Sequence, residues 1–257
     1  MSDRRPVGVF DSGVGGLSVL AALEKELPGE RFIYYGDTAY APYGTKTDTE
    51  VLGRAEAVTE LLLAQGAKAV VIACNTATAA AAHVLRAERP ELPIVAMEPA
   101  LKPAAQSRHG GSILVLATPM TLRLNKFQRL MADWGEGAVP VPCPGLMELV
   151  ERMDWEAAGV YVTETLERFR ERKIDAVVLG CTHYVFLRPL LRELTEGKDI
   201  LIVDGNAGTA RQLRRVLESK NALSGAEKGG TVLQTSGEEA GALPVMERLL
   251  AFAREKL

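Results

Sequence analysis

The sequence predicts an α/β fold of two similar lobes, each a mainly parallel sheet flanked by helices, with the functional cleft between them. Three observations support this prediction. Short apolar runs rich in β-branched residues alternate with segments of helical length. Polar residues directly follow many of these runs. Finally, two stretches with a cysteine after an apolar run, "VVIACNTATA" (70–79) and "VVLGCTHYVF" (177–186), occupy matching settings far apart in the chain.

The apolar runs mark the expected strands. They do not alternate strictly between apolar and polar residues, which indicates parallel sheets covered by helices on both faces. Up to residue 208, the expected strands are 7–11, 31–37, 69–75, 93–99, 112–118, 138–144, 175–182 and 200–205. After it, we expect a helix over 209–219, a surface loop over 219–230, a short strand over 231–235 and an amphipathic helix over 243–256.

A weak repeat suggests how these elements divide into lobes. Cys74 and Cys181 are 107 positions apart, and the strand ending at Asp11 has its counterpart at Thr118, with the same offset. We expect residues 1–97 and 208–257 to form the first lobe, so that the tail returns to it, and residues 98–207 to form the second. Ligands of open parallel sheets bind beyond the carboxyl ends of the strands, so strand ends of both lobes would line one cleft.

Composition limits the kinds of protein that this chain can be. With 30 basic and 33 acidic residues the net charge is −3, which argues against a nucleic-acid-binding surface. No run approaches about 18 apolar residues, so we expect no membrane span, and the N-terminus lacks the pattern of a signal peptide. Three cysteines are too few for a disulfide scaffold. We therefore expect a cytoplasmic protein with free thiols.

Cys74 and Cys181 stand where an apolar run gives way to polar residues. A free cysteine is often a buried structural residue. However, Asn75, Thr76 and Thr78 suit the start of a helix better than an apolar core. A thiol at a helix N-terminus has its thiolate form favoured. On the other stretch, the histidine two positions after Cys181 can orient that thiol or take its proton.

Two such thiols in one cleft are compatible with three roles. A disulfide fits poorly with a reducing compartment. A metal site would recruit His183 and Cys143, but the chain lacks the CxxC and HxxxH spacings typical of zinc ligands. The third role is acid–base chemistry, in which one thiolate removes a proton from carbon while the opposite thiol delivers another. Such a pair would invert a stereocentre.

The glycine-rich segment "DSGVGG" (11–16) follows the first expected strand. It lacks both the full dinucleotide-binding pattern and the lysine of a phosphate-binding loop, so it is weak evidence for a nucleotide site. Its glycines alone indicate no more than a tight turn from strand to helix. Asp11 and Ser12, which precede them, are better suited to bind an ammonium group or to assist a base.

The segment "DTAYAPYGTKT" (37–47) has neither a helical nor a strand period. Pro42 and Gly44 predict a turn around Tyr43. A loop of this kind is either ordinary surface structure or a lid that closes over a ligand.

Five segments combine into a specific pattern: "GVFDSGVGGLSVL", "YYGDTAYAPYGTKT", "VIACNTATA", "CPGLMELVE" and "VVLGCTHY". Together they resemble the motifs of the glutamate racemases, the cofactor-independent members of the aspartate/glutamate racemase family. They occur in the family's order and cover the chain to about residue 184. Two positions depart from the family pattern. Gly205 stands where serine is common, and Tyr40 stands where arginine is common.

The resemblance implies the interconversion of L- and D-glutamate, which supplies D-glutamate for peptidoglycan. It implies no cofactor, no metal ion and a homodimer. Cys74 and Cys181 match the two catalytic cysteines. Asp11 and His183 match residues that assist the thiols, and Glu151 matches a further acidic helper. The implied substrate contacts are Asp11, Ser12, Pro42, Tyr43, Gly44, Asn75, Thr76, Thr118, Thr182 and His183.

The residues leave three rival functions. An aspartate racemase, or a relative acting on another amino acid, would use the same thiols, although the complete PYG and CTHY motifs favour glutamate. A two-lobed binding protein for small molecules explains the cleft but not the paired cysteines. A thiol hydrolase with a Cys–His pair needs only one nucleophile. Cys143 has no partner motif, and we expect it to be structural.

Overall fold

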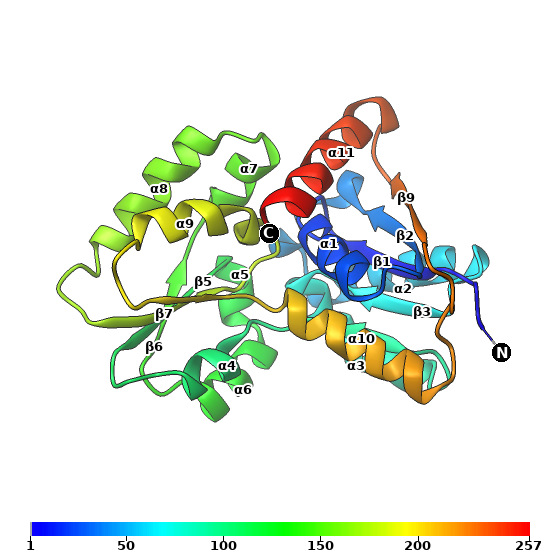
Figure 1. The fold of residues 1–257 in the computed structure, drawn as a ribbon, viewed down its shortest axis with the longest axis horizontal. Helices are drawn as coiled ribbons and strands as arrows, with labels where there is room; N and C mark the ends of the chain where they lie inside the picture. The colour runs from blue at the N-terminus through cyan, green and yellow to red at the C-terminus, as the bar shows by residue number, and fades with distance from the viewer. Residues whose placement is uncertain (1) are drawn as a thin grey trace.

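The computed structural model describes residues 2–257, which form two lobes side by side, each with its own sheet (Figure 1). Every strand pair among these residues is parallel. The first sheet has the order β4-β3-β1-β2-β9 and contains β1 (Val7–Asp11), β2 (Arg31–Gly36), β3 (Ala69–Ile72), β4 (Ile94–Ala96) and β9 (Gly230–Thr235). The second has the order β6-β5-β7-β8 and contains β5 (Ser112–Ala117), β6 (Ala138–Pro142), β7 (Ile174–Leu179) and β8 (Leu201–Val203). The predicted fold class is confirmed.

Helices cover both faces of the first sheet, as the unbroken apolar runs of its strands require. Successive residues of β1 pack against different helical layers, one on each face of the sheet. Val9 belongs to a core cluster that it shares with Leu20, whereas Phe10 belongs to another that it shares with Leu62. The first layer contains α1 (Leu17–Glu26), α10 (Asn206–Ser219) and α11 (Glu239–Lys256). The second contains α2 (Asp48–Ala64) and α3 (Asn75–Glu88).

The second sheet is also covered on both faces. Ile113 and Val115 of β5 pack with α4 (Leu101–Gln106) and α6 (Asn125–Trp134). Leu114 and Leu116, which point the other way, pack with the opposite layer. That layer contains α7 (Leu146–Glu151), α8 (Trp155–Glu167) and α9 (Arg188–Leu194).

The 107-residue repeat extends to the strands of both sheets. Adding 107 to the bounds of β3 and β4 gives 176–179 and 201–203, which lie within β7 and coincide with β8. Shifted by 107 residues, β2 falls on the residues of β6. Shifted in the same way, β1 falls on the residues around the end of β5. The strand orders agree as well, because β4-β3-β1-β2 corresponds to β8-β7-β5-β6. The two lobes therefore share one topology.

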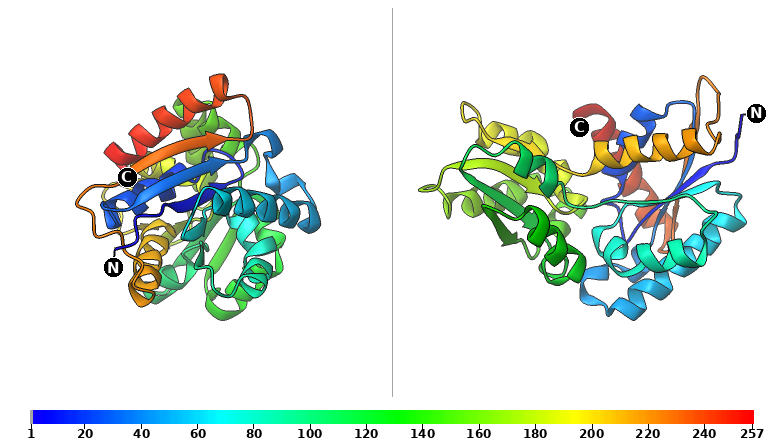
Figure 2. Two further views of the ribbon diagram at one scale, coloured as in Figure 1. Left: turned by 90° about the vertical axis from the view of Figure 1, so that its right-hand side faces the viewer. Right: turned by 90° about the horizontal axis from the view of Figure 1, so that it is seen from below.

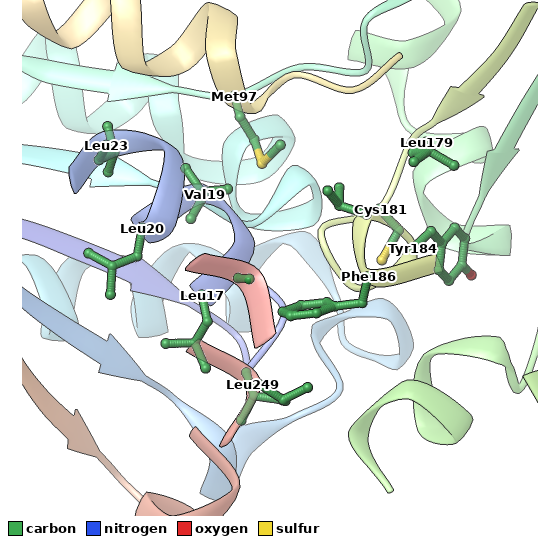
Figure 3. Packing of buried hydrophobic residues seen from close by; sticks show 14 of the residues in the cluster. Leu17, Val19, Leu20, Leu23, Met97, Leu179, Cys181, Tyr184, Phe186 and Leu249 are labelled. Carbon is green, nitrogen blue, oxygen red and sulfur yellow. The ribbon is translucent and has the colours of Figure 1, made fainter. Parts of the chain in front are cut away.

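One hydrophobic core runs across the junction between the lobes. Figure 3 shows Leu17 and Leu249 of the first sheet's helical layer close to Phe186, which follows β7 in the second lobe. Phe252 of α11 extends this contact. Its ring stacks on that of Trp155, with centroids 5.2 Å apart, and lies 6.0 Å from that of Phe186. Apolar packing therefore fixes how the two lobes sit relative to each other.

The tail adds an edge strand to the first sheet, because β9 pairs with β2 over its whole length. Figure 2 shows the chain crossing between the lobes twice, after β4 and after β8.

The lobe boundaries at 97/98 and 207/208 stay a prediction, and the second of them falls inside the first turn of α10. The predicted loop over 219–230 is not wholly exposed. Ser224 is buried, and its N–H donates to Glu30 Oε1 over 2.7 Å.

Within residues 2–257, the helices are too short or too polar to cross a membrane.

Candidate active site

A cavity of about 300 Å³ lies between the lobes, where the strands of both sheets end. The first lobe contributes residues that follow β1 and β3, and the second contributes residues that follow β5 and β7. Eleven of the residues predicted from the sequence line it: Ser12, Pro42, Tyr43, Gly44, Cys74, Asn75, Thr76, Thr118, Cys181, Thr182 and His183. The structure therefore brings the two cysteine motifs to one cavity from opposite lobes.

Two predicted site residues lie behind the cavity wall. Asp11 is fully buried beneath the glycine loop. Glu151, at the end of α7, contacts the far side of the His183 ring. Neither is among the lining residues, so they reach a ligand through other side chains.

Cys74 is the N-cap residue of α3, so the expected strand over 69–75 is too long and β3 ends at Ile72. The Ala77 N–H donates to Cys74 Sγ over 3.4 Å, and the thiol is 3.6 Å from Ser12 Oγ. The sequence predicts a favoured thiolate here, and the Ala77 bond does act in that direction. Burial outweighs it and, with the nearby Asp11 carboxylate, raises the pKa of the Cys74 thiol to about 12. The surroundings of Cys74 therefore favour the thiol over the thiolate.

Cys181 follows β7 by two residues, so the expected strand over 175–182 is also too long. The next element is a single 3₁₀ helix, η3 (His183–Leu187), rather than an α-helix. Cys181 is therefore not a helix N-cap like Cys74. The group that faces the Cys181 thiol is a side chain and not a helix N-terminus, because Cys181 Sγ lies 3.7 Å from His183 Nδ1.

His183 connects Cys181 to an acidic group. Its Nε2 lies 3.0 Å from Glu151 Oε1. Burial alone would lower the pKa of His183, but the hydrogen bonds to Cys181 and Glu151 outweigh it, and the pKa is well above its usual value. For Glu151, burial acts to raise the pKa, yet the contact with His183 leaves it lowered. This arrangement favours an imidazolium between a carboxylate and the Cys181 sulfur.

Asp11 occupies the centre of the glycine loop. Its Oδ1 accepts a 2.8 Å hydrogen bond from the Gly13 N–H, and its Oδ2 accepts a 3.4 Å bond from the Thr182 hydroxyl. Burial raises the pKa of Asp11, and the positive charge of His183 opposes that shift. Asp11 is thus in contact with residues on both sides of the cavity.

Hydrogen bonds between the lobes hold the two cysteine motifs in register. Ser18 Oγ donates to the Thr182 carbonyl over 3.1 Å, and Asn75 Nδ2 donates to the Gly180 carbonyl over 3.1 Å. The glycine loop also packs directly against His183, because a Cβ at Gly15 would lie 2.6 Å from His183 Cε1. A side chain at position 15 is therefore incompatible with the present position of the imidazole.

The segment 37–47 forms part of the cavity wall. It consists of two short 3₁₀ turns, η1 (Thr38–Tyr40) and η2 (Tyr43–Thr45), although the sequence shows no helical period. Tyr43 is fully buried. Gly44 faces α5 (Pro119–Arg123) of the second lobe, where Met120 Cβ would lie 3.6 Å from a Cβ at position 44. The loop therefore extends from the first lobe to contact the second.

Several lining residues escape the sequence analysis. Cys143 is buried as expected, and its Sγ donates to the Val141 carbonyl over 3.4 Å, but it also forms part of the wall. Met147 and Glu148 precede Glu151 by four and three positions on α7, so helical spacing predicts them on the same face. The remaining lining residues are Thr45, Pro119, Met120, Thr121, Arg123, Pro144, Gly145 and Tyr184. Four of them, Thr45, Pro144, Gly145 and Tyr184, lie in the quoted motif segments but are not predicted as site residues.

We expect Glu151→Gln to lower the pKa of His183, because a neutral amide replaces the carboxylate that stabilises the imidazolium. The chain has only three histidines, so their ring resonances can be titrated by NMR and assigned by deletion. Glu148→Gln, one turn earlier on α7, is the control and should leave the His183 pKa in place. An unchanged His183 pKa in Glu151→Gln would show that this carboxylate does not govern the imidazole.

Comparison with known proteins places the chain in a family. The family described as Asp/Glu/Hydantoin racemase matches residues 8–213. A glutamate racemase from Clostridium perfringens is 44% identical over 250 residues, which cover 95% of this chain and 96% of the relative. The structure superposes on that of glutamate racemase from Thermus thermophilus in complex with beta-chloro-D-alanine, with a TM-score of 0.81, 34% identity and coverage of 97% and 94%. Glutamate racemase from Francisella tularensis subsp. tularensis SCHU S4 in complex with D-glutamate gives a TM-score of 0.81, 27% identity and coverage of 97% and 94%. The chain therefore belongs to the Asp/Glu/hydantoin racemase family, is similar to glutamate racemases over nearly its whole length, and is an amino-acid racemase.

Proposed function

We propose that this racemase interconverts L- and D-glutamate without a cofactor, with Cys74 and Cys181 as the two proton-transfer groups. The observation that carries the proposal is the meeting of both thiols in one cavity, each supplied by a different lobe. A racemase that uses two bases needs one group on each face of the α-carbon. The names of the related proteins support glutamate as the substrate.

The proton path is as follows for L-glutamate. The Cys181 thiolate, stabilised by the His183 imidazolium, removes the α-proton and becomes a thiol. The Cys74 thiol gives its proton to the opposite face of the carbon and becomes a thiolate. The product is D-glutamate, and the two sulfurs have exchanged protonation states. Turnover of D-glutamate follows the same steps in reverse.

The surroundings of the two sulfurs differ in a way that suits this path. Burial, together with the Asp11 carboxylate, raises the pKa of the Cys74 thiol, so this group is suited to donate its proton as the carbanion forms. Beside Cys181, the His183 imidazolium, which Glu151 stabilises, places a positive charge next to the sulfur. By resemblance to the family, Cys181 acts on the L form and Cys74 on the D form.

The carbanion formed beside a carboxylate needs electrostatic stabilisation. Asn75 and Thr76, the first two residues of α3, line the cavity. The backbone N–H groups at a helix N-terminus have no partner within the helix, so a carboxylate would be favoured there. Thr118 and Thr182 add hydroxyl groups from the second lobe. The loop around Tyr43 forms one wall of the cavity, and the exclusion of water on that side would strengthen these interactions.

Family membership also suggests a cellular role. We infer that the D-glutamate is supplied for peptidoglycan synthesis, that the protein works in the cytoplasm and that it forms a homodimer. The two thiols need no metal ion or organic cofactor for the proposed steps.

The proposal is tested by incubating the purified protein with L-glutamate in deuterated water, with no cofactor added. The Cys74 thiol exchanges its proton with the solvent, so the first D-glutamate should carry α-deuterium while the remaining L-glutamate keeps its proton. Aspartate and alanine should not be racemised. Deuterium that enters both enantiomers equally from the start would contradict the two-base path. A preference for aspartate, or activity that returns after dialysis only with pyridoxal phosphate, would contradict the proposed function.

A further inference from the structure

The loop that brings Tyr43 and Gly44 to the cavity is tied to a buried carboxylate outside the cavity wall. Asp37 directly follows β2 and is fully buried. Its Oδ2 accepts a 2.6 Å hydrogen bond from the Tyr43 hydroxyl. Because Asp37 is not among the lining residues, it acts on the loop and not on a ligand.

Arg54 of α2 neutralises this carboxylate. Its Nε donates to Asp37 Oδ2 over 2.9 Å and its Nη2 donates to Oδ1 over 2.8 Å, the bidentate geometry that gives the strongest carboxylate pairs. The same guanidinium lies 3.6 Å from the centroid of the Tyr40 ring. Arg54 therefore contacts the loop directly at Tyr40 and indirectly, through Asp37, at Tyr43.

Other hydrogen bonds hold the two ends of the loop. Near its start, the Ala39 N–H donates to Ser236 Oγ over 3.1 Å. At its end, the Thr47 N–H donates to Glu50 Oε2 over 2.8 Å in the capping box that begins α2. Between these ends, the chain of contacts from Tyr43 through Asp37 to Arg54 joins the loop to the body of the first lobe.

Loss of Arg54 would leave the Asp37 carboxylate buried without its cation. An unpaired buried charge is unfavourable, so the loop would shift to expose the carboxylate to water. Tyr43 would then lose the fixed acceptor that now sets its position. The backbone of Tyr43 and Gly44 would then no longer be held against the cavity.

We propose that Arg54 is a positioning residue for racemisation, which acts through Asp37 and Tyr43 to hold this wall of the cavity in place. The inference rests on the proposed function, because it assigns the loop to glutamate binding. A wall that contacts the substrate and the transition state equally lowers the free energy of both by the same amount. Its loss therefore raises KM more than it lowers kcat. For Arg54→Ala we expect KM to rise roughly tenfold for both enantiomers and kcat to fall less than about threefold.

The test combines kinetics with chemical rescue. In Arg54→Ala, added ethylguanidinium at millimolar concentration should restore part of the lost affinity by occupying the space beside Asp37. Arg54→Lys keeps the charge but not the bidentate fork, so its KM should lie between those of Arg54→Ala and the unaltered protein. Tyr43→Phe removes the hydroxyl that binds Asp37 without unpairing a buried charge, and it should raise KM without responding to ethylguanidinium.

Arg89→Ala is the matched control. Arg89 also pairs with an acidic residue of α2, since its Nη2 lies 2.6 Å from Glu60 Oε1, and its side chain is 24% exposed like that of Arg54. Glu60, however, is 61% exposed and is not a lining residue of the cavity. KM and the response to ethylguanidinium should be unchanged in Arg89→Ala.

Hydrogen exchange gives a readout that does not need turnover. Amides of residues 38–46 should exchange faster in Arg54→Ala and at an unchanged rate in Arg89→Ala. An Arg54→Ala protein with unaltered KM, or with a raised KM that ethylguanidinium does not lower, would overturn the inference. So would unchanged exchange in the loop. Failure of the proposed function is distinguishable, because it would appear as absent glutamate racemisation in the unaltered protein.

Discussion

Cys74→Ser and Cys181→Ser should each lose racemisation almost completely, by roughly 10³-fold or more in kcat/KM. A serine hydroxyl is nearly the size of a thiol but far less acidic, so it cannot act as the proton-transfer group. L- and D-glutamate have equal free energies in water, and kcat/KM must therefore fall equally for both enantiomers in either variant. The measurement is the initial rate of racemisation from each enantiomer.

Cys143→Ser is the control for the loss of a buried thiol. Cys143 borders the cavity, but its Sγ is directed to the Val141 carbonyl. It is not a helix N-cap like Cys74, because Gly145 is the N-cap of α7. We expect it to alter stability, by about 1–3 kcal/mol, more than it alters turnover. A single-nucleophile mechanism predicts something different. One of Cys74 and Cys181 would then be dispensable, and the other would trap a covalent adduct.

Gly15→Ala should reduce kcat/KM by roughly 100-fold, because a displacement of about 1 Å in a catalytic group can cost that much. The added Cβ would lie 2.6 Å from His183 Cε1 and closer still to its Nδ1. The imidazole must therefore move away from Cys181 Sγ, Glu151 Oε1 or both. The loss should appear mainly in kcat, and the His183 resonances should shift.

Gly53→Ala tests whether that effect is specific to position 15. Gly53 is exposed in the middle of α2, and a Cβ there would meet no atom within 4 Å. Alanine at this site should leave turnover unchanged and stabilise the protein by about 0.5–1 kcal/mol. If Gly15→Ala were as active as Gly53→Ala, the close packing of the glycine loop on His183 would have no role in catalysis.

Local patterns predict the elements of this fold well. Apolar runs mark the strands, and Asn75 and Thr76 correctly indicate a helix that begins after Cys74. The same patterns predict strands that are too long before Cys74 and Cys181. Cysteine and small residues continue the apolar run in the sequence, although the backbone has already left the strand. The 107-residue offset is visible at two landmarks in the sequence, and the structure extends it to four strands.

Contacts that depend on tertiary structure could not be predicted in this way. Arg54 lies 17 positions from Asp37 with no motif to connect them, and Gly15 lies 168 positions from His183. Met120 enters the cavity wall from a helix of only five residues, which has no periodic signal of its own. Such contacts follow from the way that the two lobes face each other, and no single segment encodes that arrangement.

If each thiol serves one face of the α-carbon, the two thiols must act on opposite enantiomers of a substrate that undergoes elimination. The substrate is a glutamate analogue with chloride on the β-carbon. A single base removes the α-proton, chloride leaves with the electron pair of the C–Cl bond, and no second thiol is needed. Cys181→Ser, which retains Cys74, should eliminate chloride from the D form, and Cys74→Ser, which retains Cys181, should do so from the L form. If both variants preferred the same enantiomer, or if either still racemised glutamate at a near-normal rate, the two-thiol account would be wrong.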